Sequence, residues 1–506
     1  MSRWNLPDPV ALHAYGQPER LACHDVATGR RWRYDEFDRD IQRTVALLAD
    51  RYGIVHGDRV ATVANNGADL LLLNLAAERL GAIFVPLNYR LSTLELNAIL
   101  DDCRPTLVAT DRFDRLPALP SSGYAVHVAD LAREIAACEP AEHGPRPPND
   151  ETKIILYTSG TSGRPKGVMI TGDNIRATAL NFGVPGRVAW NSVFLCDAPM
   201  FHVIGLLPSM RATLMFGGTL HISPGFDPER TNRLLADADI GVTHYFCVPK
   251  MASMLAEQAN FEPSRWQHLQ ALFTGGSPIS PAEVNGWLER GIKVSNGFGM
   301  TEAGTIMHVP LNRQLMAETA GSVGLPAPFL EVRLVDEHDN DVAAGEPGEI
   351  LVRGANVTPG YWNRPEETAK ALTADGWLRT GDIGQADVRG HITLKDRKKD
   401  MFISGGENVF PAEVENALMD HPDVVEAAVV GVADPGWGEI GHAYVVLRAG
   451  SPADPDTLAQ HCQQRLAGYK TPKRFVIVEE LPRNAAGKLM KQVLKTPGHG
   501  PDSSAG

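Results

Sequence analysis

Three short segments of the chain are strand-like, and each is followed within a few positions by at least two glycines. They comprise residues 154–158, 270–273 and 293–296. Glycine-rich loops at the carboxyl ends of parallel strands are the usual ligand-binding positions of an open α/β sheet. Helix-like segments alternate with strand-like ones through most of the chain. The sequence therefore predicts an α/β fold with glycine-rich ligand loops at its sheet edges.

The pattern of elements changes after about residue 397. Pro411 stands where the first turn of a helix tolerates proline, and residues 424–432 and 442–447 read as strands. We predict a large N-terminal domain of several subdomains over residues 1–396 and a small α+β domain over residues 397–495. Residues 496–506 are rich in Gly, Ser and Pro and are expected to form a disordered tail.

Composition limits the partners of the chain. Its 506 residues include 48 Lys and Arg against 61 Asp and Glu, a net charge of −13, which argues against a nucleic-acid partner. No apolar stretch is long enough to span a membrane, and the N-terminus lacks a signal-peptide core. The six cysteines are scattered without a C-x-x-C pair. We expect a cytoplasmic protein, peripheral to a membrane at most and compatible with a homodimer, that acts on small molecules.

Residues 158–167 read TSGTSGRPKG and carry the sharpest chemical signal. Glycines allow the backbone to approach an anion closely, while the N–H groups and hydroxyls of such a loop can surround phosphate oxygens. Lys166 adds a cation. The string is not a Walker A loop, because Pro165 occupies the position of the second glycine. The predicted phosphate-binding residues are Thr158, Ser159, Gly160, Thr161, Ser162, Gly163 and Lys166.

Nine motifs in order along nearly the whole chain resemble those of the adenylate-forming (ANL) superfamily, which includes acyl- and aryl-CoA synthetases, luciferases and peptide-synthetase adenylation domains. The motifs are GAIFVPLN at 81–88, the loop at 158–167, PMFH at 199–202, GGS at 275–277, GFGMTE at 297–302, WLRTGD at 377–382, DRKKD at 396–400, SGGEN at 404–408 and PRNAAGK at 482–488. The sequences of the motifs, especially residues 403–411 and the string YWNRP at 361–365, are most similar to those of bacterial fatty-acyl-CoA synthetases.

The resemblance implies a ligase with two half-reactions. A carboxylate attacks the α-phosphate of Mg–ATP and releases pyrophosphate, and the thiol of coenzyme A then displaces AMP from the acyl-adenylate. A carboxylate needs this activation because its oxide is a very poor leaving group, and the protein must neutralise phosphate charge and align the attack. ATP, Mg²⁺ and coenzyme A as a substrate are the expected small molecules.

The resemblance also implies roles for single residues. Lys488, Thr301 and His202 would be catalytic, and Glu302 would hold Mg²⁺. Phe298 stands where the family usually has a tyrosine that stacks on adenine. The further implied nucleotide-binding residues are Gly275, Gly276, Ser277, Asn296, Gly297, Gly299, Met300, Asp382 and Arg397.

Two implied features concern movement of the small domain. Lys399 would be the hinge about which that mobile domain rotates between the half-reactions. The loop on the coenzyme A side would comprise Ser404, Gly405, Gly406 and Glu407.

The expected acyl pocket is apolar or small in its side chains, with no obvious Arg or Lys to pair a second carboxylate. Its residues would be His202, Val203, Ile204, Tyr245, Gly299, Gly304 and Thr305. Because Gly299 and Gly304 lack side chains, they are expected to leave room for a long channel, which favours a medium- or long-chain fatty acid.

Four alternatives remain at this point. One is an aryl-CoA ligase for benzoate- or cinnamate-like acids, and a second is an acyl-AMP ligase that loads a carrier protein. A luciferase-type oxygenase and a non-catalytic nucleotide-binding relative are the others. The retained Lys488 and Glu302 argue against a non-catalytic protein.

Overall fold

The computed structural model describes residues 8–116, 123–141, 147–158, 165–277, 279–398, 400–404, 407–483 and 489–495. The chain forms two compact units. The first comprises Met1–Val332 and Val352–Arg379, and the second comprises Arg333–Leu351 and Thr380–Gly506. The domain limits expected from the sequence, 1–396 and 397–495, remain a prediction.

Two sheets organise the first unit. The nine-stranded sheet contains, in spatial order, β15 (Leu325–Pro326), β14 (Gly304–His308), β13 (Val294–Met300), β12 (Ala271–Thr274), β11 (His244–Cys247), β9 (Val193–Cys196), β10 (Thr219–Ile222), β1 (Leu21–Asp25) and β2 (Arg31–Arg33). The six-stranded sheet contains β6 (Tyr124–His127), β5 (Leu107–Thr110), β3 (Arg59–Val63), β4 (Ile83–Pro86), β7 (Thr152–Thr158) and β8 (Lys166–Thr171). Neighbours from β13 through β1 are parallel, which confirms the predicted α/β class.

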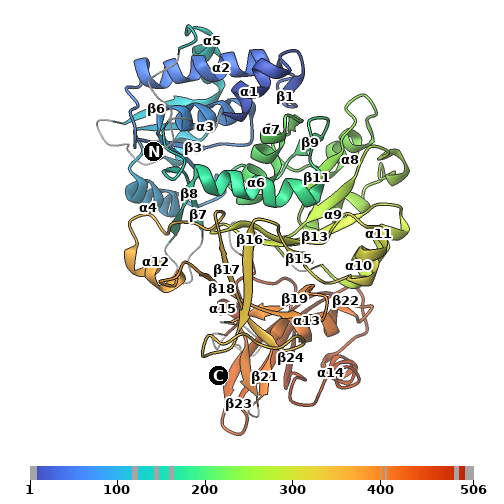
Figure 1. The fold of residues 1–506 in the computed structure, drawn as a ribbon. Coiled ribbons are helices and arrows are strands. Elements are labelled where there is room, and N and C mark those ends of the chain that lie inside the picture. The colour runs from blue at the N-terminus through green and yellow to red at the C-terminus, as the bar shows by residue number, and fades with distance from the viewer. Residues whose placement is uncertain are drawn as a thin grey trace. The chain divides into compact units, whose positions relative to one another are not determined.

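Two helices of the first unit contact both sheets (Figure 1). Helix α3 (Ala68–Leu80) packs on β1 and on β3 and β4, while α6 (Gly172–Gly186) packs on β14 and on β8. All ten residues from Ala68 to Ala77 are buried. A helix covered on every side needs no polar stripe, which explains why α3 carries four consecutive leucines and no amphipathic pattern.

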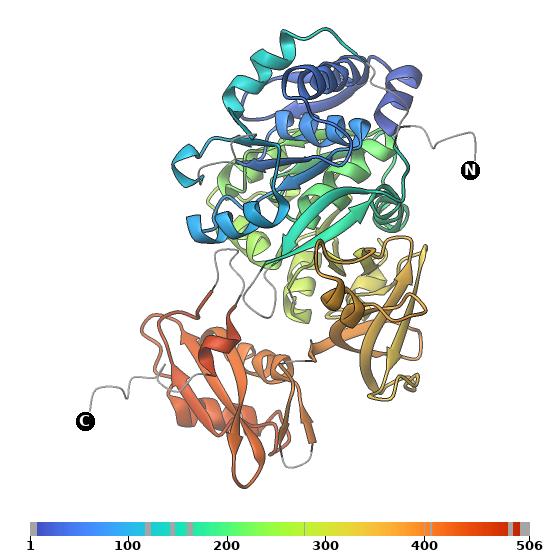
Figure 2. The same cartoon turned by 90° about the vertical axis from the view of Figure 1, so that its left-hand side faces the viewer.

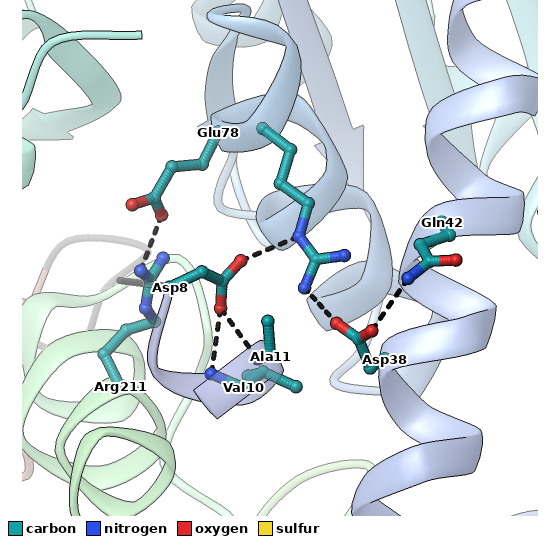
Figure 3. A network of polar contacts seen from close by, with 8 residues as sticks. Asp8, Val10, Ala11, Asp38, Gln42, Glu78 and Arg211 are labelled. Carbon is teal, nitrogen blue, oxygen red and sulfur yellow. Dashed lines mark hydrogen bonds and ion pairs between the residues drawn. The ribbon is translucent and has the colours of Figure 1, made fainter. Parts of the chain in front are cut away.

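Charged side chains join α3 to neighbouring helices (Figure 3). One carboxylate oxygen of Asp8 caps α1 (Pro9–Gly16), and the other accepts a hydrogen bond of 2.7 Å from Nε of Arg79 on α3. Arg79 also pairs with Asp38 on α2 (Tyr34–Ala46). Arg211, at the end of the π-helix η3 (Gly205–Arg211), pairs with Glu78 at 2.5 Å. These contacts fix three helices, α1, α2 and η3, around one end of α3.

The remaining helices of the first unit are shorter or lie on its surface. They are α4 (Thr93–Cys103), α5 (Val128–Ala136), α7 (Ala212–Phe216), α8 (Pro228–Ala236), α9 (Pro249–Ala256), α10 (Pro281–Glu289), α11 (Arg313–Glu318) and α12 (Pro365–Ala371). Among the described residues, no helix combines the length and apolar character that crossing a membrane requires.

The second unit has its own core. Its five-stranded sheet comprises β21 (Glu407–Val409), β20 (Phe402–Ser404), β23 (Gly438–Leu447), β22 (Val424–Asp434) and β24 (Arg474–Ile477), with α13 (Pro411–Met419), α14 (Pro455–Gln463) and α15 (Lys491–Leu494). The long strands β22 and β23 form a hairpin (Figure 2). The strands predicted at 424–432 and 442–447 are thus present, and each is longer than expected. A further sheet contains β16 (Leu330–Val335), β17 (Pro347–Gly354), β18 (Leu378–Ala386) and β19 (Ile392–Arg397).

Candidate active site

The glycines after β12 allow the backbone of the neighbouring strand to approach closely. A side chain at Gly275 would lie 2.9 Å from the carbonyl oxygen of Gly297, and one at Gly297 would lie 2.8 Å from that of Met307. Gly276 has φ +81°, in the left-handed region that favours glycine. The carboxyl ends of β12 and β13 therefore meet without intervening side chains. Gly276 and Ser277 are exposed at this edge.

The segment GFGMTE differs from its prediction. Residues 297–299 were expected to form a turn, but they continue β13 to Met300, and the turn begins at Thr301. The reason is antiparallel pairing with β14, in which Gly297 faces His308 and Met300 faces Gly304. Phe298, the residue expected to stack on adenine, is buried in this hairpin. The Nδ2 amide of Asn296 donates to the carbonyl of Ser322 at 2.8 Å.

Glu302 has defined partners on the first unit. The hydroxyl of Tyr361 donates to its carboxylate at 2.9 Å, and the backbone N–H of Thr358 donates to its carbonyl at 2.7 Å. Burial and the neighbouring carboxylate raise the pKa of Tyr361, so its hydroxyl stays protonated and continues to donate. One orientation of the Glu302 side chain is thereby fixed.

Lys166 lies beside the same tyrosine. Its ammonium is 5.4 Å from the centroid of the Tyr361 ring and pairs with Glu367 on α12. This pairing lowers the pKa of Glu367 and keeps its carboxylate charged. Neither Tyr361 nor Glu367 was among the predicted site residues. The string YWNRP that contains Tyr361 matched the family wording, and this was the signal available.

The predicted phosphate loop begins and ends in a paired strand. Thr158, the last residue of β7, faces Lys166, the first residue of β8, and its hydroxyl donates to the Lys166 carbonyl at 3.5 Å. Several predicted residues lie outside the described part of the chain: Ser159, Gly160, Thr161, Ser162, Gly163, Lys399, Gly405, Gly406 and Lys488.

The residues expected near the acid occupy different environments. His202 is exposed, yet the surrounding protein atoms and the Arg90 guanidinium lower the pKa of its imidazole. Val203 and Ile204 are half-buried at the start of η3. Tyr245 is fully buried in β11, where its hydroxyl donates to Asp197 at 3.0 Å.

The two glycines that were expected to leave room for a long channel are closely packed. The side-chain position of Gly299 is filled by the Gly304 carbonyl, and that of Gly304 is filled by Thr178 on α6. Gly304 also has φ +57°. The two glycines serve the close packing of the hairpin, with Thr305 half-buried beside them, and the long channel expected from them stays a prediction.

Two expected nucleotide-binding residues pair within the second unit. Asp382 on β18 faces Arg397 on β19, and Nε of Arg397 donates to the buried Asp382 carboxylate at 2.7 Å. Ser404 is buried and faces the exposed Glu407 across the β20–β21 pair. The short antiparallel pair thus holds both ends of the predicted coenzyme A loop.

Glu302 is the carboxylate predicted to hold the metal. No group of three or more His, Cys, Asp or Glu side chains that could hold a metal occurs among the described residues. Mg²⁺ commonly takes one or two carboxylates and completes its shell with substrate phosphates and water. The oriented Glu302 carboxylate fits this mode of binding.

Comparison with known proteins identifies the family. Residues 10–362 match the family described as AMP-binding enzyme, and residues 413–488 match the AMP-binding enzyme C-terminal domain. The chain belongs to the AMP-binding enzyme family. The predicted resemblance to the ANL superfamily is confirmed.

Relatives of this ligase act on different acids, as their names state. A feruloyl-CoA synthase of Amycolatopsis sp is 39% identical over 457 residues, which cover 89% of this chain and 92% of that protein. A 2-succinylbenzoate–CoA ligase of Geobacillus kaustophilus is 35% identical over 97% of both chains. The long-chain-fatty-acid–CoA ligase FadD13 of Mycobacterium tuberculosis is 33% identical over 94% of this chain and 95% of that one.

Solved structures agree with the fold of the ligase. ATP-bound MatB of Rhodopseudomonas palustris has a TM-score of 0.88 at 30% identity, covering 96% of this chain and 98% of that one. MenE of Bacillus subtilis, in complex with ATP and magnesium, has a TM-score of 0.86 at 30% identity and covers 97% and 100%. The chain is an AMP-forming acid–CoA ligase that uses ATP, Mg²⁺ and coenzyme A.

Proposed function

We propose that this ligase activates an apolar monocarboxylic acid that carries an aromatic ring. The observation that carries the proposal is the apolar wall at Gly276. A side chain there would lie 3.3 Å from Cδ1 of Ile204 and 3.8 Å from Cγ1 of Val248. Both residues are half-buried, whereas Gly276 is exposed at the carboxyl end of its strand. A flat ring suits a surface made of glycine backbone between two aliphatic side chains.

A medium- or long-chain fatty acid is the second candidate. It was favoured by the room expected beside Gly299 and Gly304, whose own side-chain positions are filled by neighbouring atoms. Its other support is the similarity of the motifs to those of bacterial fatty-acyl-CoA synthetases and the similarity of the chain to FadD13 at 33% identity, compared with 39% for the feruloyl-CoA synthase and 35% for the 2-succinylbenzoate–CoA ligase. Two of these three names denote aromatic acids, which supports the ring-bearing substrate.

The proposed residue roles follow the reaction. Glu302 holds Mg²⁺, whose charge offsets that of the triphosphate, and Thr301 contacts the α-phosphate. Asp382, oriented by Arg397, accepts hydrogen bonds from the ribose hydroxyls. Lys488 bridges the acid carboxylate and the α-phosphate as a mobile positive charge. Lys399 remains the proposed hinge between the half-reactions.

A panel of acids tests the proposed substrate. AMP release with Mg–ATP is measured with and without coenzyme A over ferulate, cinnamate, benzoate, octanoate, dodecanoate, palmitate and succinate. We expect coenzyme A-dependent turnover with the highest kcat/KM on a ring-bearing monocarboxylate. Succinate serves as the dicarboxylate control and should be poor, because a second carboxylate would face Ile204 and Val248.

Each other result has a definite meaning. A kcat/KM at least tenfold higher for dodecanoate or palmitate than for every aromatic acid would overturn the aromatic proposal in favour of the fatty-acid candidate. Pyrophosphate release without a coenzyme A thioester would indicate that a carrier protein is the acceptor.

A further inference from the structure

The segment Asp197–His202 joins β9 to η3 and carries the proposed acid-site residue His202. Its backbone is held by a side chain from the other sheet of the first unit. Asn66 follows β3, and its Nδ2 donates to the carbonyl of Ala198 at 2.8 Å while its Oδ1 accepts from the N–H of Met200 at 2.8 Å. Asn66 is buried, with 7% of its surface exposed. One amide thus satisfies a donor and an acceptor of the same segment, as a paired strand would.

The rest of the segment is fixed on its other sides. The N–H of His202 donates to the carbonyl of Pro199 at 3.1 Å. Gly205 lies directly against that same carbonyl, where a side chain would not fit. Asp197 accepts hydrogen bonds from Thr231 at 2.7 Å and from Tyr245. Asn66 binds the backbone of Ala198 and Met200, which lie between Asp197 and His202.

We propose that Asn66 is a positioning residue for the acid site, because it fixes the backbone from which His202 projects. This inference rests on the proposed role of His202. Asn66 need not contact the substrate. Without its amide, the Met200 N–H loses its Asn66 partner and the Ala198 carbonyl keeps only the weak S–H donor of Cys196 at 3.7 Å, so the segment moves to recover hydrogen bonds. A displacement of about 1 Å at a substrate-positioning group can lower a rate about 100-fold.

The test compares N66A with N65A. Asn65 is the adjacent asparagine, and its Oδ1 accepts from Arg112 at 3.3 Å instead of binding this segment. For folded N66A, we expect kcat/KM for the acid to fall about 10- to 100-fold while KM for ATP stays within about twofold. N65A should match the native enzyme within about twofold. A folded N66A with native acid kinetics, or one whose KM for ATP rises as much as its KM for the acid, would overturn the proposal.

N66D serves if N66A does not fold. Aspartate retains an acceptor for the Met200 N–H but places a carboxylate oxygen against the Ala198 carbonyl. We expect an intermediate loss that is confined to the acid. Loss of ATP binding in equal measure would contradict the inference.

H202A separates this inference from the proposed function. If Asn66 acts through His202, the N66A/H202A double variant should lose no more acid kcat/KM than H202A alone. Additive losses would refute the role of Asn66 while leaving that of His202 intact. Native acid kinetics in H202A would instead refute the proposed role of His202, whatever N66A does.

Discussion

Asp197 is a buried carboxyl group whose ionisation should cost stability. Desolvation raises its pKa from the ordinary 3.8 to about 6, although hydrogen bonds from Thr231 and Tyr245 and the charge of Arg230 act in the opposite direction. The difference between these two pKa values corresponds to about 3 kcal/mol. Because the folded-state pKa is raised, this stability is present below pH 4 and is lost as the pH rises through 6.

Replacing Asp197 by Asn removes the titration and keeps an oxygen that accepts from Thr231 and Tyr245. Of the 3 kcal/mol, about 1.4 kcal/mol of stability is lost between pH 5.0 and pH 7.5. The stability of D197N relative to the native protein should therefore increase by about that amount across this interval. The absolute difference at one pH also contains the changed hydrogen bonds, so the slope with pH is the diagnostic quantity.

The assay is urea unfolding at pH 5.0, 6.0, 7.0 and 7.5, followed by tryptophan fluorescence, with the transition of the first unit fitted separately. D239N is the matched control, because Asp239 is an exposed carboxylate of the same unit. It should give the native pH dependence. If D197N also parallels the native protein across the four pH values, Asp197 is ionised in the folded state throughout and the argument from burial is wrong.

Three further predictions concern single contacts. Tyr361→Phe removes the hydrogen bond to Glu302 and should raise the Mg²⁺ concentration for half-maximal adenylation by about tenfold, measured by pyrophosphate release. Glu367→Gln removes the partner of Lys166 and should lower KM for ATP about two- to fivefold, because the ammonium is then available to phosphate. Gly304→Ala places a side chain at φ +57° in filled space and should destabilise the first unit by about 1–3 kcal/mol, measured by urea unfolding.

Each of these predictions has a contrary outcome. An unchanged Mg²⁺ dependence in Tyr361→Phe would show that the tyrosine does not orient Glu302 toward the metal. A higher KM for ATP in Glu367→Gln would mean that the carboxylate holds Lys166 in its productive position. Gly291→Ala is the control for Gly304→Ala, because Gly291 has φ +87° with open space around it, so the difference between the two isolates the filled space.

The order of the motifs predicted the family, and short strand-like segments followed by glycines predicted the α/β class and several of the strands. Partners between distant segments could not be predicted in this way. Asn66 reaches a loop more than 130 positions away, and Tyr361 reaches Glu302 across 59 positions. The residues around Asn66 and Tyr361 do not indicate which distant residue each will bind, so these contacts are known only from the fold.

The surroundings of the glycines could not be predicted from the sequence either. A missing side chain is compatible with open space and with close packing, and the sequence does not distinguish the two. At Gly276 the space is exposed beside Ile204, whereas at Gly299 and Gly304 it is filled by a carbonyl and by Thr178. The expectation of a long channel treated Gly299 and Gly304 as open positions, and the structure shows that their side-chain positions are filled.

The two anchors of the segment 197–202 respond differently to pH. Asn66 holds Ala198 and Met200 through a neutral amide that does not titrate, whereas Asp197 changes charge near pH 6. The free energy of unfolding should therefore vary between pH 5 and pH 7.5, while the hydrogen bonds that position the backbone of His202 remain the same. It follows that the ratio of kcat/KM between two acids should be constant across this interval in the native enzyme. In N66A the same ratio should become pH-dependent, because the titrating Asp197 then supplies a larger share of the side-chain hydrogen bonds that hold the segment.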